Sequence, residues 1–185
     1  LWSPWTWVVG FFLVDLAFWA RHWGAHRVGV LWMMHAVHHQ SREYNLSAAA
    51  RLSWFSDTVI VGIPLAIVGL PLEVTTAFFV AGNVWQLFQH TEIVGKLGVL
   101  DRWLVTPANH RVHHGCNEQY LDRNYGSILL VWDRLFGTFE PEEEPVRYGT
   151  LSGLKTYDAT ENNLQPPRNL MAKVRGADNL GLAFQ

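Results

Sequence analysis

The sequence has only one cysteine, Cys116, in 185 residues. It therefore cannot form an internal disulfide, and a zinc or iron–sulfur site built from several cysteines of this chain is excluded. The net charge of -2 gives no sign of a surface for nucleic acid. The first residues do not show the pattern of a signal peptide, which needs a basic start and a small-residue cleavage site. Since an apolar stretch begins at Trp2 and Leu1 is not an initiator Met, we expect a segment upstream of Leu1.

Two common metal motifs are absent as well. The H-E-x-x-H pattern of zinc proteases does not occur, and neither does the Glu-x-x-His pair of carboxylate-bridged di-iron bundles. A haem held by two histidines would take single ligands from separate helices, not clusters. These absences matter because the chain is rich in histidine, the commonest metal ligand in proteins.

The nine histidines follow a repeated pattern. One H-x3-H pair and two H-x2-H-H clusters are joined by a single further histidine, giving the set His22, His26, His35, His38, His39, His90, His110, His113 and His114. On a helix, residues three or four apart share a face, so each cluster can direct two imidazoles to one point. The adjacent third ring is rotated by about 100° and can turn toward a second metal.

Nine imidazoles suit two metal ions with four or five ligands each. Imidazole sites bind Zn, Cu, Fe or Ni, whereas a structural zinc takes four ligands and usually includes cysteine. We therefore expect a histidine-rich di-iron centre, which zinc can occupy in a purified sample.

Three apolar stretches cover residues 2–19, 54–70 and 72–89. A helix of roughly 20 residues crosses a bilayer, so each stretch has about the length of a membrane span. Gly69, Leu70 and Pro71 separate the second stretch from the third, which predicts a helical hairpin. Ten tryptophans in a chain of this size favour membrane borders over a soluble protein with buried apolar helices, the alternative interpretation.

The basic residues predict an orientation. The turn of the hairpin has no Lys or Arg, whereas the segments after the first and third stretches carry Arg21, Arg27, Arg42, Arg51, Lys96, Arg102 and Arg111. The positive-inside rule places these segments in the cytoplasm, together with the histidines. The expected fold is all-α: an integral membrane protein with one span and a helical hairpin, and a cytoplasmic helical cap that holds the dimetal site. We expect residues 1–150 to form this membrane-embedded domain, and 151–185 to form a polar tail with an amphipathic helix.

Seven segments of the sequence resemble a known family. They are DLAFWARH at 15–22 with His26, LWMMHAVHH at 31–39, EYN at 43–45, WQLFQHTE at 85–92, TPANHRVHH at 106–114, DRNYG at 122–126 and WDRLFGT at 132–138. In these motifs the chain resembles the fatty acid hydroxylase and sterol desaturase superfamily of integral membrane di-iron oxygenases. Within it, the chain looks most like bacterial relatives of alkylglycerol monooxygenase. One position departs from the pattern, because Trp23 follows His22 where the family usually has arginine.

The resemblance implies an O2-dependent lipid hydroxylase with two iron ions. Its substrate would be a fatty acyl, sterol or alkylglycerol ether lipid, and desaturation is the related outcome. Electrons would come from a separate reductase, ferredoxin or cytochrome, or from a small reductant such as a tetrahydropterin. The resemblance also implies membrane helices upstream. The alternative function is that of a non-catalytic, metal-stabilised subunit of a larger membrane complex.

Five polar residues are candidates to support the ligands. A buried carboxylate often receives the ring N–H of a ligating histidine, and Asp15 lies two helical turns before His22. By resemblance the set of supporting residues also includes Asn45, Asn109, Asn124 and Asp133. Each of the asparagines could equally be a turn or cap residue.

Overall fold

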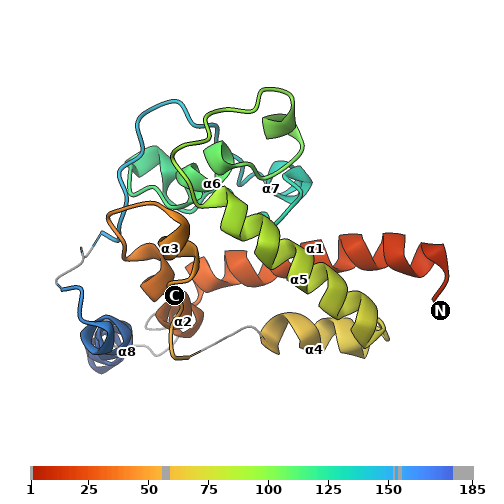
Figure 1. Cartoon of the computed structure of the whole chain (residues 1–185). Helices are drawn as coiled ribbons and strands as arrows, with labels where there is room; N and C mark the ends of the chain where they lie inside the picture. The colour runs from red at the N-terminus through yellow and green to blue at the C-terminus, as the bar shows by residue number, and fades with distance from the viewer. Residues whose placement is uncertain (1, 56–58, 152, 154–155, 177–185) are drawn as a thin grey trace.

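The computed structural model describes residues 2–55, 59–151, 153 and 156–176 (Figure 1). These residues form helices and contain only two isolated bridges, Leu104 with Leu129 and Gly115 with Tyr148, which confirms the all-α prediction. The helices are α1 (Pro4–Arg27), α2 (Gly29–His39), α3 (Leu46–Ala49), α4 (Val59–Ile67), α5 (Leu72–Gln89), η1 (Leu100–Arg102), α6 (Pro107–His113), η2 (Glu118–Tyr120), α7 (Val131–Leu135) and α8 (Ala159–Arg175).

Helix α1 has clear start and stop signals. Ser3 caps it by accepting a hydrogen bond from the backbone N–H of Thr6, and Pro4 occupies the first turn, where its missing N–H costs nothing. The helix ends at Arg27, the next residue Val28 has an extended backbone, and α2 starts at Gly29. The short break changes the direction of the chain, so α1 and α2 can pack against each other.

Helices α1, α4 and α5 pack together around a small apolar core. Its buried residues are Val14, Val61 and Leu65. Gly10 allows α5 to approach α1 closely, because a Cβ at this position would lie 2.5 Å from Cγ1 of Val74. Gly69, at φ +77°, makes the turn between α4 and α5, as the predicted hairpin requires.

Among the described residues, no helix is both long enough and apolar enough to cross a membrane. The three predicted stretches overlap α1, α4 and α5, but as membrane spans they are not confirmed. Residues 56–58, in the second stretch and including Asp57, lie outside the described residues, as do residues 177–185 of the tail.

The polar part of the chain forms a layer at one end of α5. Helix α6 packs against α5, and α6 and α7 lie together at the top of Figure 1. At the other side of α2, helix α8 packs along that helix. Helix α8, Ala159–Arg175, lies within the 151–185 tail, for which a helix was predicted. The boundary at residue 150 stays a prediction.

Candidate metal centre

The structure brings all nine histidines together in two neighbouring groups. In each group one ring nitrogen per residue lies within 4.8 Å of the others. The five-histidine group contains His22, His26, His35, His39 and His113, and the four-histidine group contains His38, His90, His110 and His114. Every predicted ligand position is therefore part of one of the two groups.

Helical geometry explains which histidines share a group. His35 and His39, four residues apart on α2, both join the five-histidine group, while His38 between them joins the other. The second H-x2-H-H cluster divides in the same way: His110 and His114 belong to the four-histidine group and His113 to the five-histidine group. A separation of four residues keeps two rings on one face, and the adjacent residue turns away by about 100°.

Within the groups the Nε2 atoms converge. In the four-histidine group, the Nε2 atoms of His90, His110 and His114 form a triangle with all three separations at 3.2 Å. Hydrogen bonds between neutral imidazoles cannot satisfy this triangle, because each ring nitrogen has a single in-plane direction for its proton or lone pair. Three lone pairs directed at one point are instead the arrangement that a shared cation completes.

Backbone carbonyls fix the protonation of three rings. The Nδ1 atoms of His22, His90 and His113 lie 2.8, 2.6 and 2.9 Å from carbonyl oxygens of Tyr125, Gln86 and Arg123. A carbonyl can only accept, so each Nδ1 carries the proton and each Nε2 presents its lone pair to the group. Metal-binding histidines are typically oriented in this way.

Burial also keeps the rings neutral. Removal from water lowers the pKa of all nine histidines, to about 4 for His90 and about 3 for His38. For His26 the carboxylate of Asp122 opposes that effect on the pKa without reversing it. At neutral pH all nine imidazoles are therefore in the form that binds a metal.

The spacing of the nitrogens fits first-row metal ions. A bond of about 2.1 Å to an imidazole nitrogen places adjacent ligand atoms about 3.0–3.4 Å apart, depending on geometry. The Nε2 separations along His22, His35, His39 and His113 are 3.0, 3.1 and 3.1 Å. The buried Nε2 of His26 has no hydrogen-bond partner among the described residues. Distances, neutral donors and this unpaired atom together fit a metal ion in each group.

Asp133 supports the five-histidine group from behind. Its fully buried carboxylate accepts hydrogen bonds from the backbone N–H groups of Tyr125 and Gly126, at 2.8 Å each, and from the indole of Trp19 at 3.0 Å. These bonds fix the loop whose Tyr125 carbonyl receives the ring proton of His22. Asp133 therefore acts on the ligand through one intervening peptide group.

Asn124 and Asn109 hold the neighbouring loop and helix α6. Asn124 adopts a left-handed backbone conformation with φ 55°, and its side-chain amide donates to the carbonyls of Asn109 and Glu140. The amide of Asn109 donates to the carbonyls of Asp101 and Leu104, which anchors the start of α6. Both asparagines are buried structural links beside the histidines.

Asp15 and Asn45 have other partners than the sequence suggested. The carboxylate of Asp15 accepts from the backbone of Ile128 and Leu129 and from the indole of Trp132, and it contacts no histidine ring among its recorded bonds. It joins α1 to the segment before α7. Asn45 is exposed and caps α3 by accepting from the backbone N–H of Ser47, as the alternative interpretation allowed.

Sequence reasoning missed two side chains that touch the histidines. The carboxylate of Asp122 lies 3.4 Å from Nδ1 of His26, and Asp122 also has a left-handed backbone, with φ 59°. Tyr44 stacks on His90 with ring centroids 5.4 Å apart, while its hydroxyl donates to the carbonyl of Gln89. Both lie inside motifs noted in the sequence, but their spacing there does not indicate which ring they contact.

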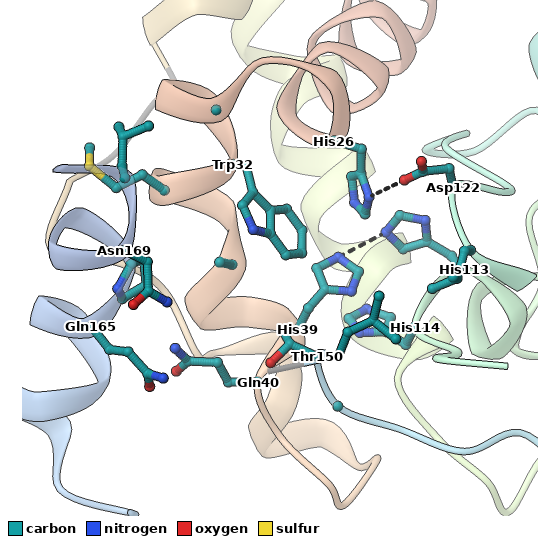
Figure 2. A pocket seen from close by; sticks show the side chains of 18 of the residues that line it. His26, Trp32, His39, Gln40, His113, His114, Asp122, Thr150, Gln165 and Asn169 are labelled. Atoms are coloured by element: carbon teal, nitrogen blue, oxygen red, sulfur yellow. Dashed lines mark hydrogen bonds and ion pairs between the residues drawn. The ribbon is translucent and has the colours of Figure 1, made fainter. Parts of the chain in front are cut away.

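A cavity of about 520 Å³ reaches the histidines from one side (Figure 2). His26, His39 and His113 of the five-histidine group line it, together with His114. Its other walls come from α2, α8 and the loops at 115–122 and 149–151, and many of the side chains there are apolar. This volume is in the range of sites that hold small organic ligands.

Comparison with known proteins is consistent with this site. The family model "Fatty acid hydroxylase" matches residues 7–138. Alkylglycerol monooxygenase of Homo sapiens is 40% identical over 158 residues, which cover 84% of this chain and 35% of that protein. Its counterpart from Danio rerio is 42% identical over 159 residues, again 84% of this chain and 35% of the relative.

More distant relatives act on other lipids by name. Ornithine lipid hydroxylase of Rhizobium tropici is 32% identical over 142 residues, or 75% of this chain and 43% of that protein. The chain spans about a third of the length of the alkylglycerol monooxygenases it matches. No solved structure matches it. The matched residues 7–138 contain all nine histidines, and the chain belongs to the fatty acid hydroxylase family.

Proposed function

We propose that the chain is the metal-binding part of a membrane oxygenase that hydroxylates a C–H bond of a lipid. The observation that carries this proposal is the cavity that ends on the five-histidine group, because a lipid lying there would have its carbon atoms beside that site. The family and the names of the relatives support lipid hydroxylation. An alkylglycerol ether is our first candidate, because two alkylglycerol monooxygenases are 40% and 42% identical to this chain.

The chain's own residues would hold the metals and the substrate. All nine histidines would be ligands, with Asp133 and Asn124 fixing the loops whose carbonyls orient His22 and His113. When bound, two iron ions would supply O2 activation and the oxidising power that an unactivated C–H bond requires. Trp32, among other apolar cavity residues, would keep water away from the reacting carbon.

The remaining components are part of the same proposal. The protein would be membrane-associated with the metal site at the cytoplasmic face, and the apolar side chains exposed on α1, α4 and α5 support contact with lipid. The electrons would come from a separate reductase, ferredoxin or cytochrome, or from a tetrahydropterin.

The test is metal content and oxidation in the same sample. Protein expressed with its natural flanking sequence and reconstituted anaerobically with ferrous iron should hold about two iron ions per chain. With O2 and a tetrahydropterin or reductase, it should convert 1-O-hexadecylglycerol to oxidised product, followed by mass spectrometry.

Two variants complete this test. His90→Ala and His22→Ala each remove one Nε2 from a different group, and both should abolish product formation. Tightly bound zinc with no O2 consumption under any donor would instead support the non-catalytic subunit. Failure to bind stoichiometric metal would refute the proposal.

A further inference from the structure

Helix α8 forms one wall of the cavity, although it lies beyond the residues that the family model matches. That model ends at residue 138, whereas Gln165, Pro166, Asn169, Leu170 and Lys173 of α8 line the cavity. The metal-binding residues are thus inside the matched region, and the wall facing them is outside it. Such a wall can determine substrate specificity, because it differs from the part of the chain that carries the family's metal ligands.

A proline in α8 fixes its position against α2. Pro166 has no backbone N–H, so the carbonyl of Asn162, four residues earlier, has no helical donor. The side-chain amide of Gln40 lies 3.3 Å from this carbonyl and donates to it. Because Gln40 directly follows His39, the bond ties α8 to the end of α2 that carries the five-histidine ligands.

Two amide side chains on α8, those of Gln165 and Asn169, line the cavity. Figure 2 shows Gln165 and Asn169 directed from α8 toward α2. Among the described residues neither side chain has a recorded hydrogen bond, in contrast to Gln40, which is engaged by Asn162 and Arg51. Gln165 is half-buried and Asn169 is exposed at the edge of the cavity, so both amides can contact a ligand that enters between the two helices.

The chemistry of these groups indicates an uncharged headgroup. An amide offers donors and an acceptor, and a hydroxyl group can match both, whereas a phosphate accepts only. The charged residues of the cavity lining are Asp122 at the histidine end and Lys173 on α8, and Lys173 already interacts within the protein. A phosphate is usually held by several cationic groups, and Lys173 is the one Lys or Arg in this lining, balanced by the carboxylate of Asp122.

We propose that α8 is the specificity element of the cavity, and that Gln165 and Asn169 bind the hydroxyl groups of an uncharged polyol headgroup, such as glycerol, on a lipid. The apolar part of the same lipid lies along Trp32, Met33 and Leu170. This inference rests on the proposed function, since it names the substrate class of the same site. It predicts that the headgroup, and not only the chain, determines binding.

The test measures binding without turnover. Metal-loaded protein is kept free of O2 and titrated with three radiolabelled lipids of the same chain: 1-O-hexadecylglycerol, its 2,3-di-O-methyl ether and its 3-phosphate. The native protein should bind the glycerol lipid about tenfold more tightly than the dimethyl ether, as expected for two hydrogen bonds. In the double variant Gln165→Leu/Asn169→Leu this preference should disappear, while binding of the dimethyl ether stays unchanged.

The controls make the outcomes distinct. Arg168→Gln removes an exposed ion pair with Glu161 on α8 and should leave the preference intact. If the double variant does not fold, the single change Gln165→Met should reduce the preference severalfold. An unchanged preference in a folded variant, or tighter binding of the 3-phosphate, would overturn the assignment. Since binding is measured apart from oxidation, a protein that shows the preference but oxidises no lipid would contradict only the proposed function.

Discussion

Replacing Asp133 by alanine should both destabilise the protein and loosen one metal site. The carboxylate accepts hydrogen bonds from Trp19, Tyr125, Gly126 and the hydroxyl of Thr138, at 2.6–3.0 Å. Each buried donor left without a partner costs about 1–3 kcal/mol, so four donors cost about 4 kcal/mol at the low end of that range. For a chain of this size, this corresponds to a fall in Tm of about 8–16 °C.

The effect on metal binding should be confined to one group. The Tyr125 carbonyl that receives the ring proton of His22 is held by Asp133, whereas the four-histidine group does not touch this loop through any recorded bond. We expect Asp133→Ala to retain about one metal ion per chain where the native protein holds about two. The measurements are thermal unfolding by circular dichroism and metal content by mass spectrometry after gel filtration.

Asp15→Ala is the matched control. Asp15 is also a buried carboxylate with three donors, but its partners Ile128, Leu129 and Trp132 do not include the Tyr125 peptide. It should lower Tm and leave the metal content close to that of the native protein. If both variants lose the same amount of metal, Asp133 has no specific role in orienting His22, and the reasoning is refuted.

Three further predictions concern stability. Burial lowers the pKa of His90 to about 4, so below pH 6.5 the folded state binds fewer protons than the unfolded state. The free energy of unfolding of the metal-free protein should therefore be highest above about pH 6.5, and His90 should lower it by about 1.4 kcal/mol per pH unit between pH 6.5 and 4. Urea unfolding at several pH values would measure this. A flat profile would contradict this. Gly126→Ala would place a Cβ 2.6 Å from a side-chain atom and 2.7 Å from a carbonyl oxygen, and should cost about 1–3 kcal/mol in thermal unfolding, whereas Gly95→Ala, with open space around it, should have little effect. Arg111→Met should lower the free energy of unfolding by about 3 kcal/mol, because it leaves the Glu142 carboxylate without its ion-pair partner. Adding Glu142→Met should restore part of this loss. If the effects of the two changes simply add, the two residues are not coupled.

The helical periodicity of the histidines made the division within each H-x2-H-H cluster predictable. His35 and His39 share a group and His38 does not, as residues four apart and adjacent residues should behave on one helix. The same local rule covers His110, whose partner is His114. Which clusters combine was not readable from spacing, because it depends on how α1, α2 and α6 pack.

The supporting residues were less predictable for a similar reason. Asp15 was predicted to support His22, but its partners are in a segment more than a hundred residues later. Asp122 reaches His26 only because its backbone is left-handed, and no local pattern indicated this for an aspartate before Arg123. The role of α8 as a cavity wall could not be predicted either. In the sequence Pro166 indicates the end of a helix, and not a contact with α2.

The adjacent pairs His38–His39 and His113–His114 each send one ring to either group. Consecutive Cα atoms are about 3.8 Å apart, so in each pair a single peptide unit links the two sites covalently. Because the residues of each pair are neighbours in the chain, moving the two groups apart would pull ligands out of both. A metal ion bound in one group would fix the backbone of both pairs, so the second ion should enter a group whose ligands are already positioned.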